Sequence, residues 1–149
     1  MRKAISLGGI FVLSLCLSSL LRADLQKAMA EPNLEKRSQL ALDNASDAYR
    51  EARTDYQKAD ATGLTAAIKE IQDSVELAYQ SLKDTGKDPR KHSKWFKRAE
   101  IDTRNLLRRL DAFQRDMSFE DRPMLNALIA RVQKIHDDLL LGLMEGKPK

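Results

Sequence analysis

The chain has 149 residues, 32% of them charged and 42% hydrophobic, with a formal net charge of +4. This length predicts one domain, large enough to bury a core without disulfides. Four basic residues precede position 31, and residues 31–149 carry 22 basic against 21 acidic side chains. We therefore expect no nucleic-acid binding, because a nucleic-acid-binding domain carries a marked basic excess.

The first thirty residues are typical of a secretory signal peptide. Residues 1–3 carry two positive charges, residues 4–21 carry none, and small residues follow. The A-x-A pattern at 28–30 predicts cleavage after Ala30, with cleavage after Ala23 as the alternative. An uncleaved membrane anchor is the rival interpretation, because an apolar stretch of this length can just span a bilayer. Cleavage is favoured and predicts an exported protein, periplasmic or secreted.

Cys16 is the single cysteine and lies inside the predicted signal peptide. The residue before it is Leu15, where a lipoprotein signal needs a small side chain, so we expect no lipidation. Without cysteine beyond residue 30, the exported chain has neither disulfides nor thiol chemistry.

Four segments have the composition and periodicity of α-helices, and none alternates with the period of a strand. We expect helices over residues 32–59, 63–85, 93–117 and 119–142, followed by a polar tail over 145–149. Short links make consecutive helices antiparallel. The predicted fold is therefore all-α, an antiparallel up-down four-helix bundle.

Each predicted helix carries an apolar or small stripe at helical spacing. The stripe in residues 32–59 consists of alanines, which predicts the close approach of a neighbouring helix. The other three stripes step by three and four residues, as in coiled coils. Their members are Leu64, Ile68, Ile71, Val75, Ala78 and Leu82; Phe96, Ala99, Thr103, Leu106, Leu110, Phe113 and Met117; and Leu125, Leu128, Val132, Ile135 and Leu139.

Capping residues indicate where these helices begin. Thr62 and Ser93 are candidate N-caps for the second and third helices. Ser118 and Asp121 have the spacing of a capping box, which starts the fourth helix at residue 119. Pro123 favours a start near Asp121 instead, and the sequence leaves both starts open.

The chain offers little that resembles a catalytic or metal site. His92 and His136 are its only histidines, and both are expected to be exposed. A metal site of His136 with Asp137 or Glu120 lacks the paired spacing that such sites use. No nucleophile, base and orienting acid can be assembled. We predict a non-enzyme without catalytic residues, metal or cofactor.

Acidic residues recur every four positions at Asp43, Asp47, Glu51 and Asp55. Like charges at this spacing share one helix face and destabilise the helix slightly. A solvated acidic face is the simpler interpretation. The alternative is that this face docks on a basic surface, belonging either to this chain or to a second copy.

Basic residues concentrate in residues 83–115, with 11 basic against 5 acidic side chains. On a helical wheel, most of them lie opposite the core stripe of the third helix. The proposed partner-binding residues are Lys91, Lys94, Trp95, Lys97, Arg98, Ile101, Arg104 and Arg108. The simpler interpretation is a solvated face. The alternative is a contact surface for an acidic protein or an anionic envelope component, with Trp95 and Ile101 as apolar anchors.

Four blocks carry a resemblance to a known group of proteins: LALDNASDAYREAR (40–53), SVELAYQSLKDTGKDPRK (74–91), WFKRAEIDTRNLLRRLD (95–111) and RVQKIHDDLLLG (131–142). Together they resemble small exported helical proteins of diderm bacteria whose function is unknown. The resemblance implies export and an all-helical fold, and it supplies no activity, ligand or catalytic residue.

The first two predicted helices also resemble a tetratricopeptide hairpin in composition. Tyr56, Ala67 and Tyr79 do not fall at the offsets of that repeat, and no second copy is evident. A four-helix bundle is therefore the favoured interpretation.

The sequence thus predicts an exported, non-catalytic interaction or scaffold protein. A small-ligand or metal carrier is the first alternative and rests on analogy with other helical bundles. A membrane-anchored helical protein is the second, if the N-terminus is not cleaved. A homodimer through the alanine face of the first helix is a further alternative.

Overall fold

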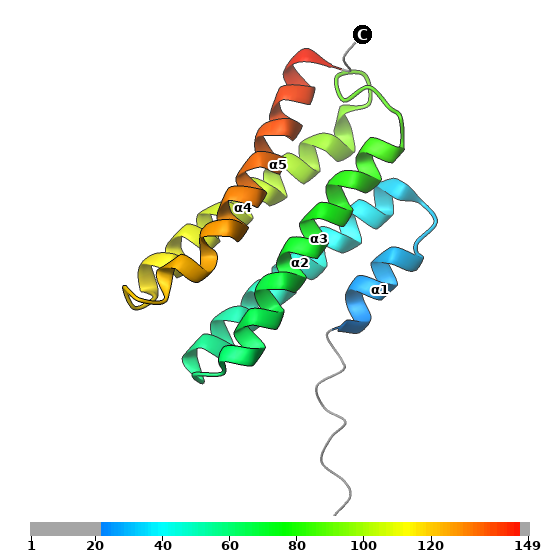
Figure 1. The fold of residues 1–149 in the computed structure, drawn as a ribbon. Helices are drawn as coiled ribbons and strands as arrows, with labels where there is room; N and C mark the ends of the chain where they lie inside the picture. Colours follow the sequence, from blue (N-terminus) through cyan, green and yellow to red (C-terminus); the bar gives the residue numbers. More distant parts are fainter. Residues whose placement is uncertain (1–21, 147–149) are drawn as a thin grey trace, which may run out of the picture.

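The computed structural model describes residues 22–146, and within them all regular structure is helical (Figure 1). Its elements are α1 (Arg22–Ala30), α2 (Leu34–Gln57), α3 (Ala61–Asp84), α4 (Ser93–Asp116), the 3-10 helix η1 (Arg122–Leu125) and α5 (Asn126–Glu145). The predicted all-α fold with four long packed helices is confirmed.

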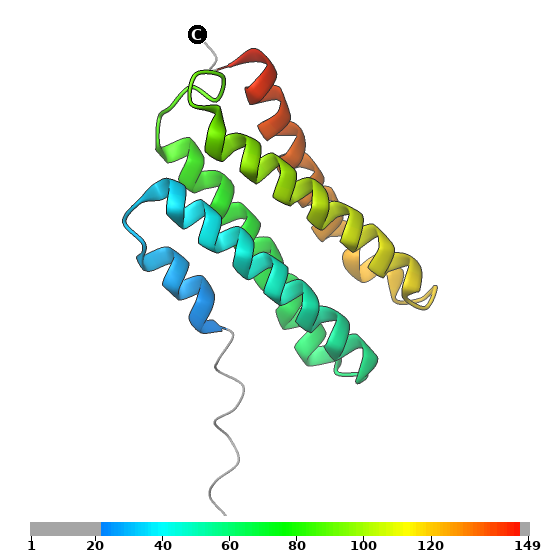
Figure 2. The same cartoon turned by 180° about the vertical axis from the view of Figure 1, so that it is seen from behind.

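The four long helices form two antiparallel hairpins that pack face to face. One hairpin is α2–α3 and the other is α4–α5. Helix α3 lies beside α5 on the face seen in Figure 1, and α2 lies beside α4 on the face seen in Figure 2. Neighbours across the hairpins therefore run in the same direction, whereas neighbours along the chain run in opposite directions.

Small residues hold the α2–α3 hairpin together, and these two helices approach each other more closely than any other pair. The buried residues of α2 are mostly alanine, as the sequence predicts, and α3 adds alanine and serine. The small buried residues are Ser38, Ala41, Ala45, Ala48, Ala52, Ala67, Ser74, Ala78 and Ser81. Asn44 is buried among them and its amide donates to the Ser74 hydroxyl at 2.9 Å.

Large apolar side chains fill the space between the hairpins and inside α4–α5. Every predicted stripe residue of α4 and α5 is buried, from Phe96 to Met117 and from Leu125 to Leu139. Phe113 packs edge-on against the rings of Tyr49 and Tyr56 of α2, with centroids 6.1 and 5.7 Å away. These aromatic contacts join the two hairpins. Ile68 is the one predicted stripe residue of α3 that is only partly buried.

The helix ends differ from the predicted ones by a few residues. Asp60, not Thr62, caps α3, and its carboxylate accepts from the Gly63 N–H at 2.9 Å. The predicted contact between Ser118 and Asp121 is present, because the Asp121 N–H donates to the Ser118 hydroxyl at 3.3 Å. It leads first into η1, so α5 itself begins at Asn126 and ends at Glu145.

Helix α1 lies within the segment predicted to be a signal peptide. It packs on α2 and, less extensively, on α3, and Ala28 is fully buried in that contact. Cleavage after Ala30 would remove this helix, whereas cleavage after Ala23 would keep most of it. Both sites stay predictions, and residues 1–21, including Leu15 and Cys16, lie outside the described residues.

Candidate functional site

The basic face of α4 is the surface that the sequence predicts to bind a partner. It lies on the side of the helix opposite the core stripe. With Phe96, Ala99, Thr103, Leu106 and Leu110 turned inward, the opposite side of the helix faces solvent. This side belongs to the face on which α2 and α4 are neighbours (Figure 2).

Seven of the eight predicted partner-binding residues are exposed: Lys91, Lys94, Lys97, Arg98, Ile101, Arg104 and Arg108. The eighth, Trp95, is half-buried against the core, and the Lys94 ammonium lies 5.0 Å from its ring centroid. Trp95 therefore packs partly against the core and makes a cation–π contact with Lys94. Ile101 is 40% exposed in the middle of the basic side chains.

Ion pairs within the chain occupy only part of this basic face. Arg98 pairs with Asp102 at 2.8 Å and Arg104 with Glu100 at 3.6 Å, and each pair is separated by four residues on α4. In the part of the chain that the structure describes, the side chains of Lys91, Lys97 and Arg108 make no ion pair. These three side chains carry positive charge that is free to meet an anionic partner.

The acidic run on α2 does not form one continuous docking face. Asp43 lies near Arg98 and Asp102 of α4, and its pKa is raised because burial and the Asp102 charge outweigh the attraction of Arg98. Asp47 pairs with Arg50 at 2.9 Å. The start of the run thus faces the chain's own basic segment, one of the alternatives that the sequence left open.

Polar bonds fix α4 against α2 below this surface. The Arg109 guanidinium donates to the Ser46 hydroxyl at 2.7 Å and lies 4.1 Å from the centroid of the Tyr49 ring. Arg53 pairs with Asp116 at 3.1 Å near the other end. The basic face is therefore presented on a helix whose C-terminal half is fixed to α2 by polar contacts.

His136 is not exposed, contrary to the sequence-based expectation. Its side chain is 13% exposed, and its Nε2 lies 3.0 Å from Oε1 of Glu100, a residue of α4 that is itself buried. Glu100 is next to the α4 core stripe and His136 is next to the α5 core stripe, and these two helices are consecutive and antiparallel. This placement is the sequence signal from which their contact could have been predicted. Glu120, proposed as the alternative to Asp137 in a metal site with His136, lies in the turn before η1. His92 is exposed, as expected.

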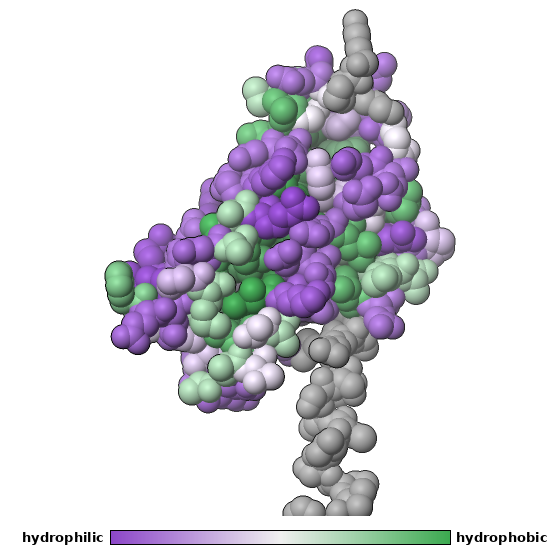
Figure 3. Space-filling model, in the orientation of Figure 1, coloured by the Kyte–Doolittle hydropathy of each residue, from purple (hydrophilic) through white to green (hydrophobic). Residues whose placement is uncertain are grey.

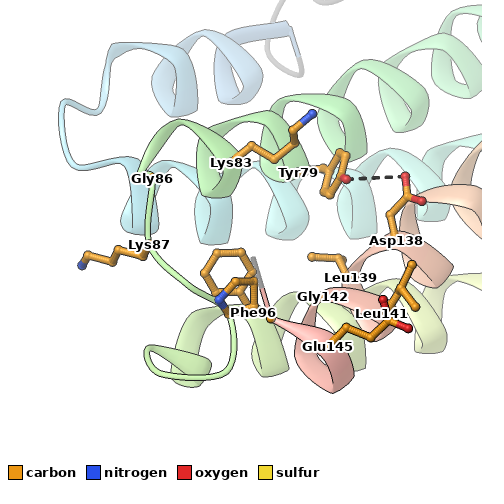
Figure 4. A pocket seen from close by; sticks show the side chains of 12 residues that line it. Tyr79, Lys83, Gly86, Lys87, Phe96, Asp138, Leu139, Leu141, Gly142 and Glu145 are labelled. Carbon is orange, nitrogen blue, oxygen red and sulfur yellow. Dashed lines mark hydrogen bonds between the residues drawn. The ribbon is translucent and has the colours of Figure 1, made fainter. Parts of the chain in front are cut away.

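A groove runs between α3 and α5 on the face opposite α2 and α4. Figure 3 shows apolar surface gathered along it, and Figure 4 shows its end beside the linker that precedes α4. This end has a volume of about 450 Å³. The apolar residues lining it are Tyr79, Pro89, Phe96, Leu139 and Leu141. The Tyr79 hydroxyl donates to Asp138 at 3.4 Å across the groove.

Two features are absent from residues 22–146. No group of three or more His, Cys, Asp or Glu side chains in this range is arranged to hold a metal ion. No helix in this range combines the length and apolar character needed to cross a bilayer.

Comparison of the chain with protein-family models, with curated proteins and with solved structures finds no match. The resemblance to small exported helical proteins stays a prediction. The function proposed below therefore rests on the chain's own residues.

Proposed function

We propose that the protein is an exported, non-catalytic interaction protein that binds an acidic partner through the basic face of α4. The partner is an acidic protein surface or another anionic component of the cell envelope. The main supporting observation is the solvent-facing side of α4, where Lys97 and Arg108 make no ion pair within the described chain and Ile101 is exposed between them in sequence. Lys91, in the linker before α4, adds a third such cation.

Cations and an apolar side chain contribute differently to such a contact. Unpaired cations speed encounter with an anionic surface, and this contribution weakens as salt rises. The partly exposed Ile101 and Trp95 offer apolar area that becomes buried only when the partner docks. Because α4 is anchored to α2 through Arg109 and Arg53, little conformational entropy is lost on binding.

Charge reversal at Lys97 and Arg108 tests this proposal. Neither side chain makes an ion pair within the described chain, so Lys97→Glu with Arg108→Glu should leave helicity and melting temperature unchanged. A photo-crosslinking residue at Ile101 in intact cells should capture a partner with the unaltered face and lose it with the reversed one. Capture of the same proteins by both forms would contradict the proposal.

A matched control makes the same change in net charge on other surfaces. Lys36→Glu with Lys58→Glu alters exposed cations at the start and just beyond the end of α2. The Lys36 change also breaks its 3.2 Å ion pair with Glu31, so the melting temperature of this variant is measured alongside. This variant should capture the same partner from position 101 as the unaltered chain. Its behaviour separates recognition by the α4 face from a general effect of charge.

Export is tested separately, at the N-terminus. N-terminal sequencing of protein recovered from the periplasm or medium should begin at Glu31 or Asp24. Recovery only in the membrane fraction with residue 1 intact would instead support the anchored alternative.

The alternative of a small-ligand carrier has one supporting observation, the groove of about 450 Å³ between α3 and α5. Pockets of this size and apolar character hold small molecules in many proteins. A thermal shift on adding a small apolar compound, lost in Leu141→Asp at the groove's edge, would support it. Unchanged melting with both proteins would remove it.

A further inference from the structure

Phe119 is the most exposed large apolar side chain among the described residues, at 84%. It lies in the turn between α4 and η1, at the end of the bundle away from the linker between α3 and α4 (Figure 1). An aromatic side chain left in water forgoes the favourable burial of a large apolar area. Such a residue suits an anchor that fills a partner's pocket.

The turn that carries Phe119 is held by hydrogen bonds on both sides of it. The Ser118 N–H donates to the Tyr56 hydroxyl at 2.8 Å, and the Ser118 hydroxyl donates to Asp121 at 2.7 Å. The Tyr56 hydroxyl donates to the same carboxylate at 3.1 Å. The turn is therefore ordered before any partner binds, which lowers the entropic cost of using Phe119 as an anchor.

The opposite end of the bundle contains an apolar pocket, the end of the α3–α5 groove beside the linker that precedes α4 (Figure 4). Phe96 and Leu139 form a buried floor, and Leu141 is 52% exposed at the edge. Gly142 lets the linker lie close, because a Cβ there would stand 3.3 Å from Cγ of Pro89. A pocket of about 450 Å³ has room for one phenyl ring and part of its backbone.

Both signs of charge line the pocket, and one unpaired charge beside each feature is complementary to the other. Lys87 and Asp138 are paired within the chain with Glu35 and Lys134, and Glu145 is a further acidic residue of the lining. Glu120 follows Phe119 and is exposed, and it makes no ion pair within the described chain. Lys83, at the edge of the pocket, is also exposed; its ammonium lies 5.4 Å from the centroid of the Tyr79 ring and makes no ion pair within the described chain. A Phe119 side chain that enters the pocket of another copy brings an acidic residue toward a basic one.

We propose that Phe119 of one copy inserts into the α3–α5 pocket of a second copy, so that molecules associate head to tail. The anchor and the pocket lie at opposite ends of α4, about 35 Å apart for a 24-residue helix. One copy therefore cannot fill its own pocket, and each added copy leaves one anchor and one pocket free. Such heterologous contacts build extended chains.

This inference does not depend on the basic face of α4, although it extends the proposed scaffold role. Head-to-tail chains present many α4 faces to one anionic surface and raise its apparent affinity through multivalency. Lys97→Glu with Arg108→Glu should leave self-association unchanged, so failure of one proposal leaves the other standing.

Sedimentation velocity of the folded protein, from about 1 µM to about 1 mM, measures the association. The unaltered chain should form species that grow with concentration. Phe119→Ala should weaken the association at least about 30-fold, as expected for a truncated anchor. Leu141→Asp should do the same, whereas Leu140→Asp, also exposed on α5 but outside the pocket, should not.

Mixing the two defective variants gives the sharpest test. Phe119→Ala keeps a working pocket and Leu141→Asp keeps a working anchor, so each alone should be monomeric. Together they should form a one-to-one dimer that grows no further. A monomeric unaltered chain at every concentration, or a mixture that stays monomeric, would overturn the proposal.

The charge pair gives an independent check. Glu120→Lys and Lys83→Glu should each weaken association a few-fold, and the double variant should recover it. If both single variants associate as strongly as the unaltered chain, Glu120 of one copy does not lie beside Lys83 of the next. Melting temperatures should not change, because both side chains are exposed.

Discussion

The α2–α3 hairpin is closed by small side chains, whereas the α4–α5 hairpin is closed by large ones. Alanine and serine dominate the first interface, and their backbones lie close together. Leucine, phenylalanine, valine and isoleucine dominate the second, and its helices lie further apart. A close interface of small residues leaves no room for a pocket, and Glu70 of α3 reaches only its edge, where it accepts from the Asn44 amide at 2.7 Å.

The wider interfaces made by α4 and α5 contain the features on which function is proposed. His136 and Glu100 fit between these two helices, and the α3–α5 groove opens where the hairpins meet. The α4–α5 turn also presents Phe119. We infer that the first hairpin mainly supplies a rigid support and the second supplies the surfaces for contact.

Leu110→Ala should have the largest effect on stability, because it removes a large side chain from the second hairpin's core. Leu110 is fully buried, so truncation leaves a cavity and should lower the free energy of unfolding by about 3 kcal/mol. Chemical denaturation measures this loss. Leu141→Ala, at an exposed position, should change it by less than about 0.5 kcal/mol. Equal losses would show that α4 and α5 lack a packed core.

Ala48→Leu tests the first hairpin in the opposite sense, by adding volume. Ala48 is buried one turn beyond Asn44, whose amide reaches Ser74 of α3. A leucine there must push the close helices apart, which should cost about 2 kcal/mol of unfolding free energy. Ala127→Leu, at an exposed site on α5, should be nearly neutral. A neutral Ala48→Leu would mean that the hairpin is not closely packed.

The helical stripes could be predicted from the sequence because periodicity identifies which side of a helix is apolar. Thr103 interrupts the α4 stripe, yet it is buried because its hydroxyl donates to the Ala99 carbonyl at 2.9 Å. The exposure of the six basic-face residues on α4 follows from the same wheel, whereas Lys91 lies in the linker before the helix.

Periodicity does not say which neighbour each apolar face meets. The order of helices around the bundle, and hence the α3–α5 groove, depends on how the two hairpins pack. The burial of His136 required knowing that Glu100 of α4 lies opposite it. The exposure of Phe119 depends on the turn held by Tyr56, more than sixty residues away in sequence. These three features depend on contacts between segments that are distant in sequence, and local sequence patterns do not reveal such contacts.

His136→Ala sharpens the comparison by removing the polar contact inside the second hairpin. Glu100 would lose its 3.0 Å partner while staying buried, which should cost about 1 kcal/mol of unfolding free energy. Thermal or chemical denaturation measures the loss, and exposed His92→Ala should show none. Adding Glu100→Gln should recover part of it, because a neutral amide is easier to bury than a carboxylate. Additive losses in the double variant would argue against coupling.

Glu51→Gln should have the smallest effect, and it is expected to stabilise the first hairpin. The pKa of Glu51 is raised by burial and by the charges of Asp55, Asp47 and Glu70. Because the pKa is raised in the folded state, the folded protein binds the Glu51 proton more tightly than the unfolded chain does. The protonated carboxyl therefore favours folding at acid pH, and this contribution is lost as pH rises through the folded-state pKa. Replacing Glu51 should therefore add about 0.3 kcal/mol at pH 7 and nothing below about pH 4. A gain at Glu51 that persists in acid would assign the effect to packing rather than charge.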